Sequence, residues 1–489
     1  MQHQHAETST STSTTPTPDP LPPVLLVLHG ARGDLAKRLV LPALADLASA
    51  GLLSDRWLLL GTGRRDVSDD DFTALVQDAL REFGSDDTDP HTLDGHLRYA
   101  RSFDGDDPGE LVDAMAQATA DLDGDPAPTV VHYLAVPPSA FEPTTRGLRT
   151  HDLTDGTRVV YEKPYGTSPE SFEELDTLVH EVLDEEQVFR IDHFLGKEAT
   201  QNLHVLRFGN ELFGGMWNNR HVTEVQIDLP ETLDVADRAE FYDATGAALD
   251  MLVTHLFQVA AEVAMEPPAR FDAEHLAAAR EDVIACFRPL DPEQDVVLGQ
   301  FRGYRDIDEV ADDSQTDTFV AARLWVDNDR WRGVPFLLRT GKKMARSAQQ
   351  VTLVLRTPDE LFGEPAGPGR ISLSLAGDGA IEVTTTVKRP GPELRLATGT
   401  ASLALDDVDG HPLTAYASLL HDVLVGDRSL FTTPEVLRSA WRAFAPLQGP
   451  GRPAPEEYAP GGWGPAAADR LAGPDGWVLG DRSNPHPED

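Results

Sequence analysis

The sequence predicts an α/β domain with a doubly wound parallel sheet, followed by an α+β domain built on a large, mainly antiparallel sheet. Two observations support this prediction. From about residue 24 to residue 198, short apolar runs that end in glycine or proline turns alternate with amphipathic helical segments, the pattern of parallel strands joined by helices. Between roughly residues 316 and 405, strand patterns follow one another directly. The length of 489 residues suits two large domains.

Four strand-and-turn segments define the first domain. They are VLLVLHG (24–30), RWLLLGTGRR (56–65), PTVVHYLAVPP (128–138) and TRVVYEKPYG (157–166). An amphipathic helical pattern over residues 34–53 follows the first strand and ends near Gly51. Because parallel strands present their carboxyl ends at one edge of a sheet, we expect ligands to bind at the turns that follow them.

The other segments set the domain boundaries. Residues 1–22 are rich in Ser, Thr and Pro and are expected to form a disordered tail. We place the first domain at residues 23–198 and the second at residues 199–489. Alternation of apolar and polar side chains, which indicates antiparallel sheet with one covered face, occurs in the second domain over residues 350–358, 370–377 and 380–388.

Charge and composition restrict the class of partner. The formal net charge is −41, which argues against nucleic acid or an anionic membrane surface. No segment approaches the roughly 20 apolar residues that would span a bilayer. Cys286 is the single cysteine, so we expect a small packing residue in a reducing cytoplasm.

The lysines are few and concentrated in motifs. An anionic substrate of so acidic a protein would need a local cationic pocket. Salt screens charges that lie more than about 10 Å away, so the distant acidic surface would not cancel the attraction of such a pocket. The chain has six lysines among its 41 basic residues: Lys37, Lys163, Lys197, Lys342, Lys343 and Lys388. A general drift toward arginine explains their scarcity but not their positions, and five of the six fall within the short motifs described below.

A glycine turn, Gly30-Ala31-Arg32-Gly33-Asp34-Leu35, follows the first strand and opens a helix. Glycines here would let the backbone approach a pyrophosphate at the helix N-terminus. The spacing departs from G-x-G-x-x-G, so an ordinary strand–helix turn stays an alternative. At the end of the second strand stand Arg64 and Arg65, with no acid. Arginine at this place favours NADP, because it can bind the 2′-phosphate. Two alternatives stay open: the arginines are ordinary surface residues, or one of them stacks on adenine, in which case NAD is also possible.

Acids, imidazoles and lysines cluster in four further places. They are Lys163 after the fourth strand, Asp192 and His193 within RIDHFLGKE (190–198), Asp250 and His255 on one helical pattern, and Lys342 after the strand VPFLLRT. A lone Asp-His pair would be explained as a polar cap at a helix end. Burying so many charged and polar groups at strand ends and on an apolar helix costs free energy unless they are paired, so their presence together indicates a functional site.

The motifs resemble those of the bacterial glucose-6-phosphate dehydrogenase family, in its order and spacing, from about residue 24 to the end. They are GARGDLAKR, HYLAVPP, EKPYG, RIDHFLGKE, LRFGNELF, FYDATGAALDML with His255, VPFLLRTGK, AYASLLHDVL and SAWR. The resemblance implies an NADP-binding Rossmann-type domain and an α+β domain for substrate binding and dimerisation. It also implies a cytoplasmic homodimer or homotetramer.

The activity implied is oxidation of D-glucose 6-phosphate at C1 to 6-phosphoglucono-1,5-lactone with hydride transfer to NADP, the first step of the oxidative pentose phosphate pathway. By resemblance His255 is the base, Asp192 orients it, and no metal takes part. The implied substrate-binding residues are His193, Lys197, Glu231, Asp250, Lys342 and Lys163. The implied cofactor-binding residues are Gly30, Ala31, Arg32, Gly33, Asp34, Leu35, Arg64, Tyr133 and Lys163, and Pro137 lies where the same strand passes the cofactor. Pro164 is a candidate cis proline.

Three positions depart from the family's pattern. Phe194 stands where a tyrosine usually supplies a hydroxyl to the phosphate, and Ser347 stands where a second basic residue is usual, with Arg346 one place earlier. Thr254 replaces an asparagine before the base. Two of these losses fall on substrate contacts. A dehydrogenase of another aldose or aldose 6-phosphate, and a non-catalytic NADP-binding paralogue, therefore stay open as alternatives.

Overall fold

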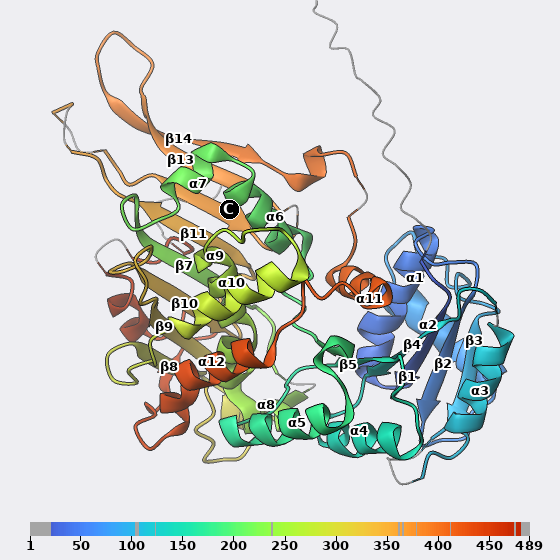
Figure 1. Ribbon diagram of the computed structural model, residues 1–489. Helices are drawn as coiled ribbons and strands as arrows, with labels where there is room; N and C mark the ends of the chain where they lie inside the picture. Colours follow the sequence, from blue (N-terminus) through green and yellow to red (C-terminus); the bar gives the residue numbers. More distant parts are fainter. Residues whose placement is uncertain are drawn as a thin grey trace, which may run out of the picture.

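The computed structural model describes residues 21–480 except 103–106, 123, 236–237, 360–361, 364–365, 378, 411 and 474–475. Most of the predicted tail therefore lies outside the described residues. The first domain contains a six-stranded parallel sheet in the order β3-β2-β1-β4-β5-β6, on the right of Figure 1. Its strands are β1 Val24–His29, β2 Trp57–Gly63, β3 Leu97–Arg101, β4 Thr129–Leu134, β5 Arg158–Tyr161 and β6 Val188–Arg190.

Helices cover both faces of this sheet, as the alternating pattern predicts. They are α1 Leu41–Ser49, α2 Asp69–Phe83, α3 Leu111–Asp121, α4 Phe141–Thr150 and α5 Pro169–Val182. A π-helical turn, η1 Ala36–Val40, precedes α1, and the chain turns at Gly51, so the predicted helix ends where expected. Ser68 caps α2 by accepting a hydrogen bond from the Asp71 backbone N–H at 3.1 Å.

One element of this domain comes from far along the chain. Helix α11, Ala415–Val425, packs against α1, and its apolar side chains join the core under β1 and β2 (Figure 1). Arg158 of β5 donates hydrogen bonds of 2.7 Å to the carbonyls of Val423 and Leu424 at the end of α11, groups that have no partner inside the helix. The first domain is therefore completed by residues beyond position 414.

The second domain contains a nine-stranded sheet in the order β14-β13-β12-β11-β7-β10-β9-β8-β15. The β7–β10 and β8–β15 pairings are parallel and the other pairings between described strands are antiparallel. Its strands are β7 Val222–Pro230, β8 Val296–Phe301, β9 Phe319–Trp325, β10 Pro335–Gly341, β11 Gln350–Leu355, β12 Arg370–Ser374, β13 Ile381–Lys388, β14 Leu396–Leu403 and β15 Glu456–Tyr458.

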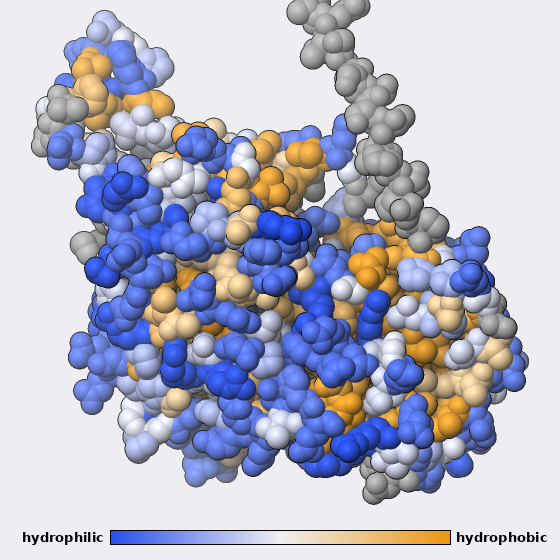
Figure 2. Space-filling model, viewed as in Figure 1, coloured by the Kyte–Doolittle hydropathy of each residue, from blue (hydrophilic) through white to orange (hydrophobic). Residues whose placement is uncertain are grey.

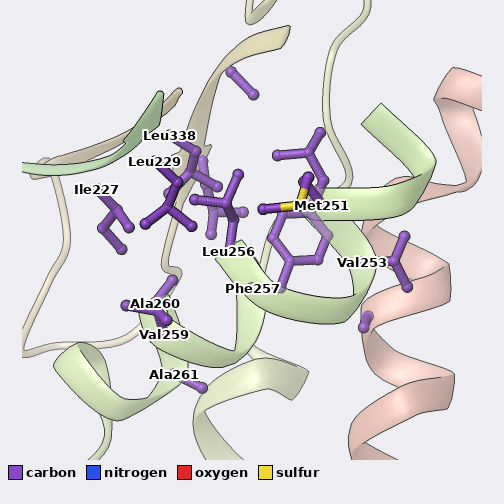
Figure 3. Close-up of a cluster of buried hydrophobic side chains, with 14 of the residues drawn as sticks. Ile227, Leu229, Met251, Val253, Leu256, Phe257, Val259, Ala260, Ala261 and Leu338 are labelled. Atoms are coloured by element: carbon purple, nitrogen blue, oxygen red, sulfur yellow. The ribbon is translucent and has the colours of Figure 1, made fainter. Parts of the chain in front are cut away.

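A long, mostly apolar helical run packs its side chains on this sheet (Figure 3). It consists of α8 Ala239–Ala247, the π-helix η5 Ala248–Leu256 and α9 Phe257–Ala264. Contrary to the sequence expectation, residues 239–264 are long and apolar enough to span a membrane, but 83% of the most apolar stretch is buried, as in a core helix. Other helices of this domain are α6 Glu198–Phe208, α7 Glu211–Met216, α10 Ala273–Ala285 and α12 Pro434–Phe444.

Gly246 bends this run within α8, just before the π-helix η5 begins. Its φ of 71° is in the left-handed region, and a Cβ there would lie 2.7 Å from Oδ1 of Asp317, so a larger residue would be strained and would clash. Asp317 accepts a hydrogen bond of 2.6 Å from the Ala248 backbone N–H at the start of η5. The bend therefore fixes where η5 begins.

A buried ion cluster joins α6, α9 and α10. Glu262 of α9 is fully buried, contacts His204 of α6, and accepts a hydrogen bond of 2.5 Å from Arg280 of α10. Burial alone would raise the pKa of Glu262, but Arg280 and His204 outweigh it and lower the pKa to about 2. The cluster is stable only while every charge in it keeps its partner.

We expect Glu262→Gln to lower the free energy of unfolding by about 3–5 kcal/mol, because it leaves the buried Arg280 guanidinium without its counter-ion. Urea unfolding followed by circular dichroism measures this. Glu266→Gln is the matched control, since Glu266 pairs with Arg330 with 59% of its side chain exposed and should cost less than about 1 kcal/mol. Equal losses from the two variants would contradict this account of the cluster.

Candidate active site

The carboxyl ends of β5 and β6 bring two of the expected residues together. Tyr161 and Arg190 are register partners in these parallel strands, and the Ile191 N–H donates to the Tyr161 carbonyl at 3.0 Å. Lys163 and Asp192 follow at the same edge of the sheet. The Lys163-Pro164 peptide bond is cis, which confirms that expectation.

The π-helix η5 supplies Asp250 and His255. Five residues apart, these side chains would stand about 140° apart around an α-helix, but hydrogen bonds from residue i to i+5 place them on one face. The Lys163 ammonium lies 3.2 Å from Oδ1 of Asp250 and 2.6 Å from Nε2 of His255. Residues from both domains therefore meet at one point.

The hydrogen bonds fix the proton on His255. An ammonium only donates, so Nε2 accepts from Lys163 and the ring proton sits on Nδ1, where it is donated to Oδ1 of Asp192 at 2.7 Å. His255 is 1% exposed and Asp192 is 4% exposed. Burial, aided by the Lys163 charge, holds the pKa of His255 well below its usual value. Burial also raises the pKa of Asp192 to about 6. The imidazole is thus a neutral base with Nε2 as its basic atom.

His193, Phe194 and Lys197 lie in a turn beside this pair. This stretch is not helical, because His193–Gly196 form turns and α6 begins at Glu198. The His193 ring lies 4.6 Å from the His255 ring, and the Lys197 ammonium lies 4.1 Å from the centre of the Phe194 ring. Lys197 also donates to the side-chain carbonyl of Gln349. Burial lowers the pKa of Lys197 to about 8.

Glu231 and Lys342 form an ion pair nearby. Glu231 follows β7 and Lys342 follows β10, and these adjacent strands are parallel, with Pro230 opposite Gly341. The buried ring of Tyr242 lies beneath the pair, with its centre 5.7 Å from the Lys342 ammonium. Burial would raise the pKa of Asp250, but Lys163, helped by Lys342, outweighs it and holds the pKa of that carboxyl below its usual value.

Of the three departures from the family's pattern, Phe194 is buried beside His255, whereas Thr254 is partly exposed and Ser347 is exposed. The Ser347 hydroxyl accepts a hydrogen bond from the Thr232 N–H at 2.9 Å. Arg346 is exposed. The Thr254 hydroxyl donates to the Asp250 carbonyl one turn earlier at 2.5 Å. Gln349, in the same loop as Ser347, reaches Lys197, a contact that sequence reasoning missed because nothing in a lone glutamine marks it.

Tyr133 and Glu162 lie behind Lys163. Tyr133 is buried and donates to Glu162 at 2.6 Å, and the Tyr416 hydroxyl of α11 lies 3.5 Å from the other Glu162 oxygen. Burial raises the pKa of Glu162, and the Tyr133 hydrogen bond opposes that shift. Tyr133, expected at the cofactor, thus points to the residue before Lys163. Glu162 and Tyr416 were missed as individual residues, although both fall within motifs that the sequence singles out.

A second cavity, of about 460 Å³, lies at the carboxyl ends of β1, β2 and β4. Of the expected cofactor residues, Gly30, Arg32, Gly33 and Arg64 line it, and Pro137 does so as well. Asp34, Leu35 and the buried Ala31 belong to the turn and the start of the helix. A Cβ on Gly30 would lie 2.4 Å from the Ala135 carbonyl oxygen. The close turn, the free N–H groups of a helix start and the arginines fit a dinucleotide phosphate group.

Three side chains of the first site are of types that bind metal ions. Ligand atoms of Asp192, His193 and His255 lie within 4.8 Å of one another. Both nitrogens of His255 already have hydrogen-bond partners, one of them the Lys163 ammonium, which repels a cation. The geometry therefore favours proton transfer over metal coordination at His255.

Fold and site together define a dehydrogenase with a nicotinamide-dinucleotide domain and a second domain that completes the catalytic site. Sequence models of the NAD-binding and C-terminal domains of glucose-6-phosphate dehydrogenase match residues 27–202 and 204–478. The chain belongs to the glucose-6-phosphate dehydrogenase family.

Relatives named glucose-6-phosphate 1-dehydrogenase match along nearly their whole length. The protein from Zymomonas mobilis is 35% identical, over 92% of this chain and 98% of its own. One from Mycobacterium tuberculosis is 35% identical, over 93% and 96%. A crystal structure of the Mycobacterium avium protein superposes with a TM-score of 0.81 at 32% identity, covering 93% and 99%. A glucose-6-phosphate dehydrogenase in complex with glucose 6-phosphate superposes with a TM-score of 0.87 at 28% identity, covering 94% and 99%.

We expect His255→Ala to lower turnover at least about a hundredfold while cofactor still binds, since a positioned general base contributes about 10²–10⁴-fold. Steady-state rates and a cofactor titration measure the two effects. His275→Ala is the control, because that imidazole lies on α10 and pairs with Asp272 at 2.6 Å, outside the site. Near-normal turnover of His255→Ala would remove His255 as the base.

Proposed function

We propose that the protein oxidises D-glucose 6-phosphate at C1 to 6-phosphoglucono-1,5-lactone with NADP as the hydride acceptor, the first step of the oxidative pentose phosphate pathway. The observation that carries the proposal is the neutral, buried His255, oriented by Asp192, in a chain that belongs to this family. The printed names of its relatives support the same substrate.

The residues divide the chemistry among them. NADP, when bound, accepts the hydride that leaves C1. Nε2 of His255 takes the proton of the C1 hydroxyl, and Asp192 stabilises the imidazolium that forms. Because Lys163 donates to that same Nε2 atom, the hydroxyl must replace it there. Asp250 stays within reach of the displaced ammonium.

The phosphate end of the sugar is assigned to His193 and Lys197, and the hydroxyl groups of the sugar to Glu231, Asp250 and Lys342. Lys197 is supported as a phosphate ligand by its partner, because its ammonium donates to the neutral Gln349 and makes no ion pair with a described carboxylate. Lys342, by contrast, is paired with a carboxylate. That pair offers a donor and an acceptor to sugar hydroxyls.

NADP is proposed over NAD because arginines, and no carboxylate of the described residues, line the cavity at the end of β2. An acid at that place would bind the ribose hydroxyl of NAD, whereas arginine suits a 2′-phosphate. Lys163 lies at the next strand end, between this cavity and the sugar site, and is assigned to both ligands.

A homodimer, or a tetramer built from dimers, is proposed as the assembly, with the boundary at residue 198 separating the cofactor domain from the domain that associates. Apolar side chains are exposed on the outer strands β13 and β14 and just beyond them: Val387, Leu394, Leu403 and Val408 are 42–57% exposed. Figure 2 shows apolar groups among polar ones on this projecting part of the surface. Light scattering of the purified protein measures the mass. We propose the cytoplasm as its compartment, which suits a chain with one cysteine.

The direct test is nicotinamide reduction by the purified protein with NADP or NAD and glucose 6-phosphate, beside free glucose and galactose 6-phosphate. We expect turnover with glucose 6-phosphate and NADP, and much weaker turnover with the other sugars. Preference for another sugar would reassign the substrate. No turnover on any sugar, with NADP still bound in a titration, would identify a non-catalytic paralogue.

We expect Phe194→Tyr to lower KM for glucose 6-phosphate by about tenfold or more, because a hydrogen bond to a charged group contributes about 1.5–3 kcal/mol. The added hydroxyl would stand beside Lys197, whose ammonium now lies over the ring. Initial rates at varied sugar phosphate measure it, with free glucose as the control substrate. An unchanged KM would mean that Gln349 or another donor already fills this place.

A further inference from the structure

A segment from near the end of the described chain contacts the loop that carries Lys342. Residues 456–473 and 476–480 are here called the C-terminal segment. It begins with β15, which pairs in parallel with β8. Further on, the Gly461 N–H donates to the Lys343 carbonyl at 2.7 Å, and the Ala345 N–H donates to the Gly462 carbonyl at 2.9 Å. The C-terminal segment therefore borders the site, although every residue assigned to the sugar lies at or before position 342.

The hydroxyl of Tyr458 makes the direct link to Lys342. It donates to the Lys342 carbonyl at 2.6 Å, and the Thr318 carbonyl is a more distant acceptor at 3.2 Å. The Thr318 hydroxyl lies 3.1 Å away and donates to Tyr458, while it accepts from the Phe301 N–H at 2.9 Å. Tyr458 is 3% exposed, and burial raises its pKa, so the hydroxyl keeps the proton that it donates.

The peptide units on both sides of Lys342 are hydrogen-bonded at both ends. The unit after it, whose carbonyl accepts from Tyr458, has an N–H that donates to the Leu233 carbonyl at 2.9 Å. The unit before it has an N–H that donates to the Thr318 carbonyl at 2.9 Å and a carbonyl that accepts from the Glu231 N–H at 2.9 Å. The backbone of Lys342 can therefore rotate only if one of these hydrogen bonds breaks.

Lys343, the next residue, has a strained backbone. Its φ of 48° is in the left-handed region, which residues other than glycine adopt uncommonly. Such strain persists only where the surrounding structure fixes the backbone. Here the Tyr458 hydroxyl binds the carbonyl before Lys343, and the Gly461 N–H binds the carbonyl after it. The C-terminal segment thus holds the turn from which Lys342 reaches Glu231.

The far end of the C-terminal segment is attached to the centre of the nine-stranded sheet. The side-chain amide of Gln226 in β7 makes hydrogen bonds of 3.0 and 2.8 Å with the backbone of residues 476–478. Arg339 of β10 donates to the Leu479 carbonyl at 2.8 Å. Because successive side chains of a strand point to opposite faces, Gln226 lies on the face away from Ile227, which packs toward the helical run (Figure 3). The C-terminal segment is therefore fixed to the sheet on both sides of its contact with the loop.

We infer that Tyr458 is a positioning residue for the sugar: through the Lys342 carbonyl it fixes the backbone from which Lys342 and Glu231 reach the substrate. The inference rests on the proposed function in taking the sugar as the ligand of this ion pair, and it adds the C-terminal segment to the site. Tyr458 binds a backbone carbonyl and not a reacting group. Loss of its hydroxyl should therefore weaken sugar binding and leave the chemical step unchanged.

The test is steady-state kinetics of Tyr458→Phe, which keeps the ring and removes only the hydroxyl. We expect KM for glucose 6-phosphate to rise about 3- to 10-fold, the effect of one neutral hydrogen bond, while kcat and KM for NADP change less than about twofold. A change in KM alone indicates lost binding in the ground state. Hydrogen exchange followed by mass spectrometry is the second readout, in which the amides of residues 342–345 should exchange about 3- to 10-fold faster.

Tyr304→Phe is the matched control. The rings of Tyr304 and Tyr458 are both buried and both pack on Phe301, at 5.4 and 6.4 Å between ring centres. The Tyr304 hydroxyl, however, donates to Asp243 of α8 at 3.1 Å. Its KM for glucose 6-phosphate and its loop exchange should match those of the unaltered protein. Equal changes in the two variants would overturn the inference, as would a Tyr458→Phe variant that loses kcat and NADP affinity in proportion to sugar affinity.

The two proposals fail separately. If the unaltered protein oxidises no sugar, the proposed function is refuted, and the exchange of residues 342–345 decides the role of Tyr458: faster exchange in Tyr458→Phe alone upholds it, and equal exchange overturns it. If glucose 6-phosphate is oxidised and Tyr458→Phe changes neither KM nor exchange, the activity stands and the positioning role is refuted.

Discussion

A hydrogen bond between two buried titratable side chains, Asp192 and His255, links the two domains at the point where the chemistry is assigned. Each residue comes from a different sheet system, one from the end of β6 and one from the helix over the nine-stranded sheet. A carboxylate this deeply buried is tolerated only with partners. The hydrogen bond between Asp192 and His255 depends on the relative position of the domains, on the π-helix and on the bend at Gly246. A displaced helix would leave both side chains buried without a partner.

The surrounding cations are held in two different ways. Lys163 and Lys342 form ion pairs with carboxylates, whereas Lys197 donates a hydrogen bond to the side-chain amide of Gln349. The arginines of the cofactor cavity have no partner in the described chain. In a protein with a net charge of −41, the places assigned to phosphate groups thus hold cations that make no ion pair with the described residues. Because screening confines these fields to about 10 Å, the acidic exterior does not cancel them.

Much of this architecture could be predicted from the sequence because periodicity is a local property. The strands at Val24–His29, Trp57–Gly63, Thr129–Leu134 and Arg158–Tyr161 and the apolar helical run over residues 241–264 stand where their patterns indicate. Strands β3 and β6 were missed, because arginines interrupt the apolar run of β3, LRYAR, and β6, VFR, has only three residues. So was β7, whose place at the centre of the second sheet follows only from pairing. The site residues themselves came from motifs rather than from periodicity.

What sequence reasoning could not supply is the contact between residues remote in the chain. Nothing in the turn 190–198 indicates that Gln349 would reach Lys197, and nothing in β4 indicates that Tyr133 would donate a hydrogen bond to Glu162. The spacing of Asp250 and His255 suits a helix whose hydrogen bonds run to i+5, which propensities do not distinguish from an α-helix. These features depend on tertiary packing, which a single sequence does not display.

Helix α11 has a consequence for the order in which the protein is made. The first domain buries α11 in its core, and Arg158 holds the end of that helix, so a nascent chain that has reached only residue 414 exposes the apolar side of α1. The N-terminal domain cannot fold to completion ahead of the rest, as domains commonly do during synthesis. The apolar surface that α11 covers stays exposed until that helix has been synthesised, and exposed apolar surface of this kind favours aggregation.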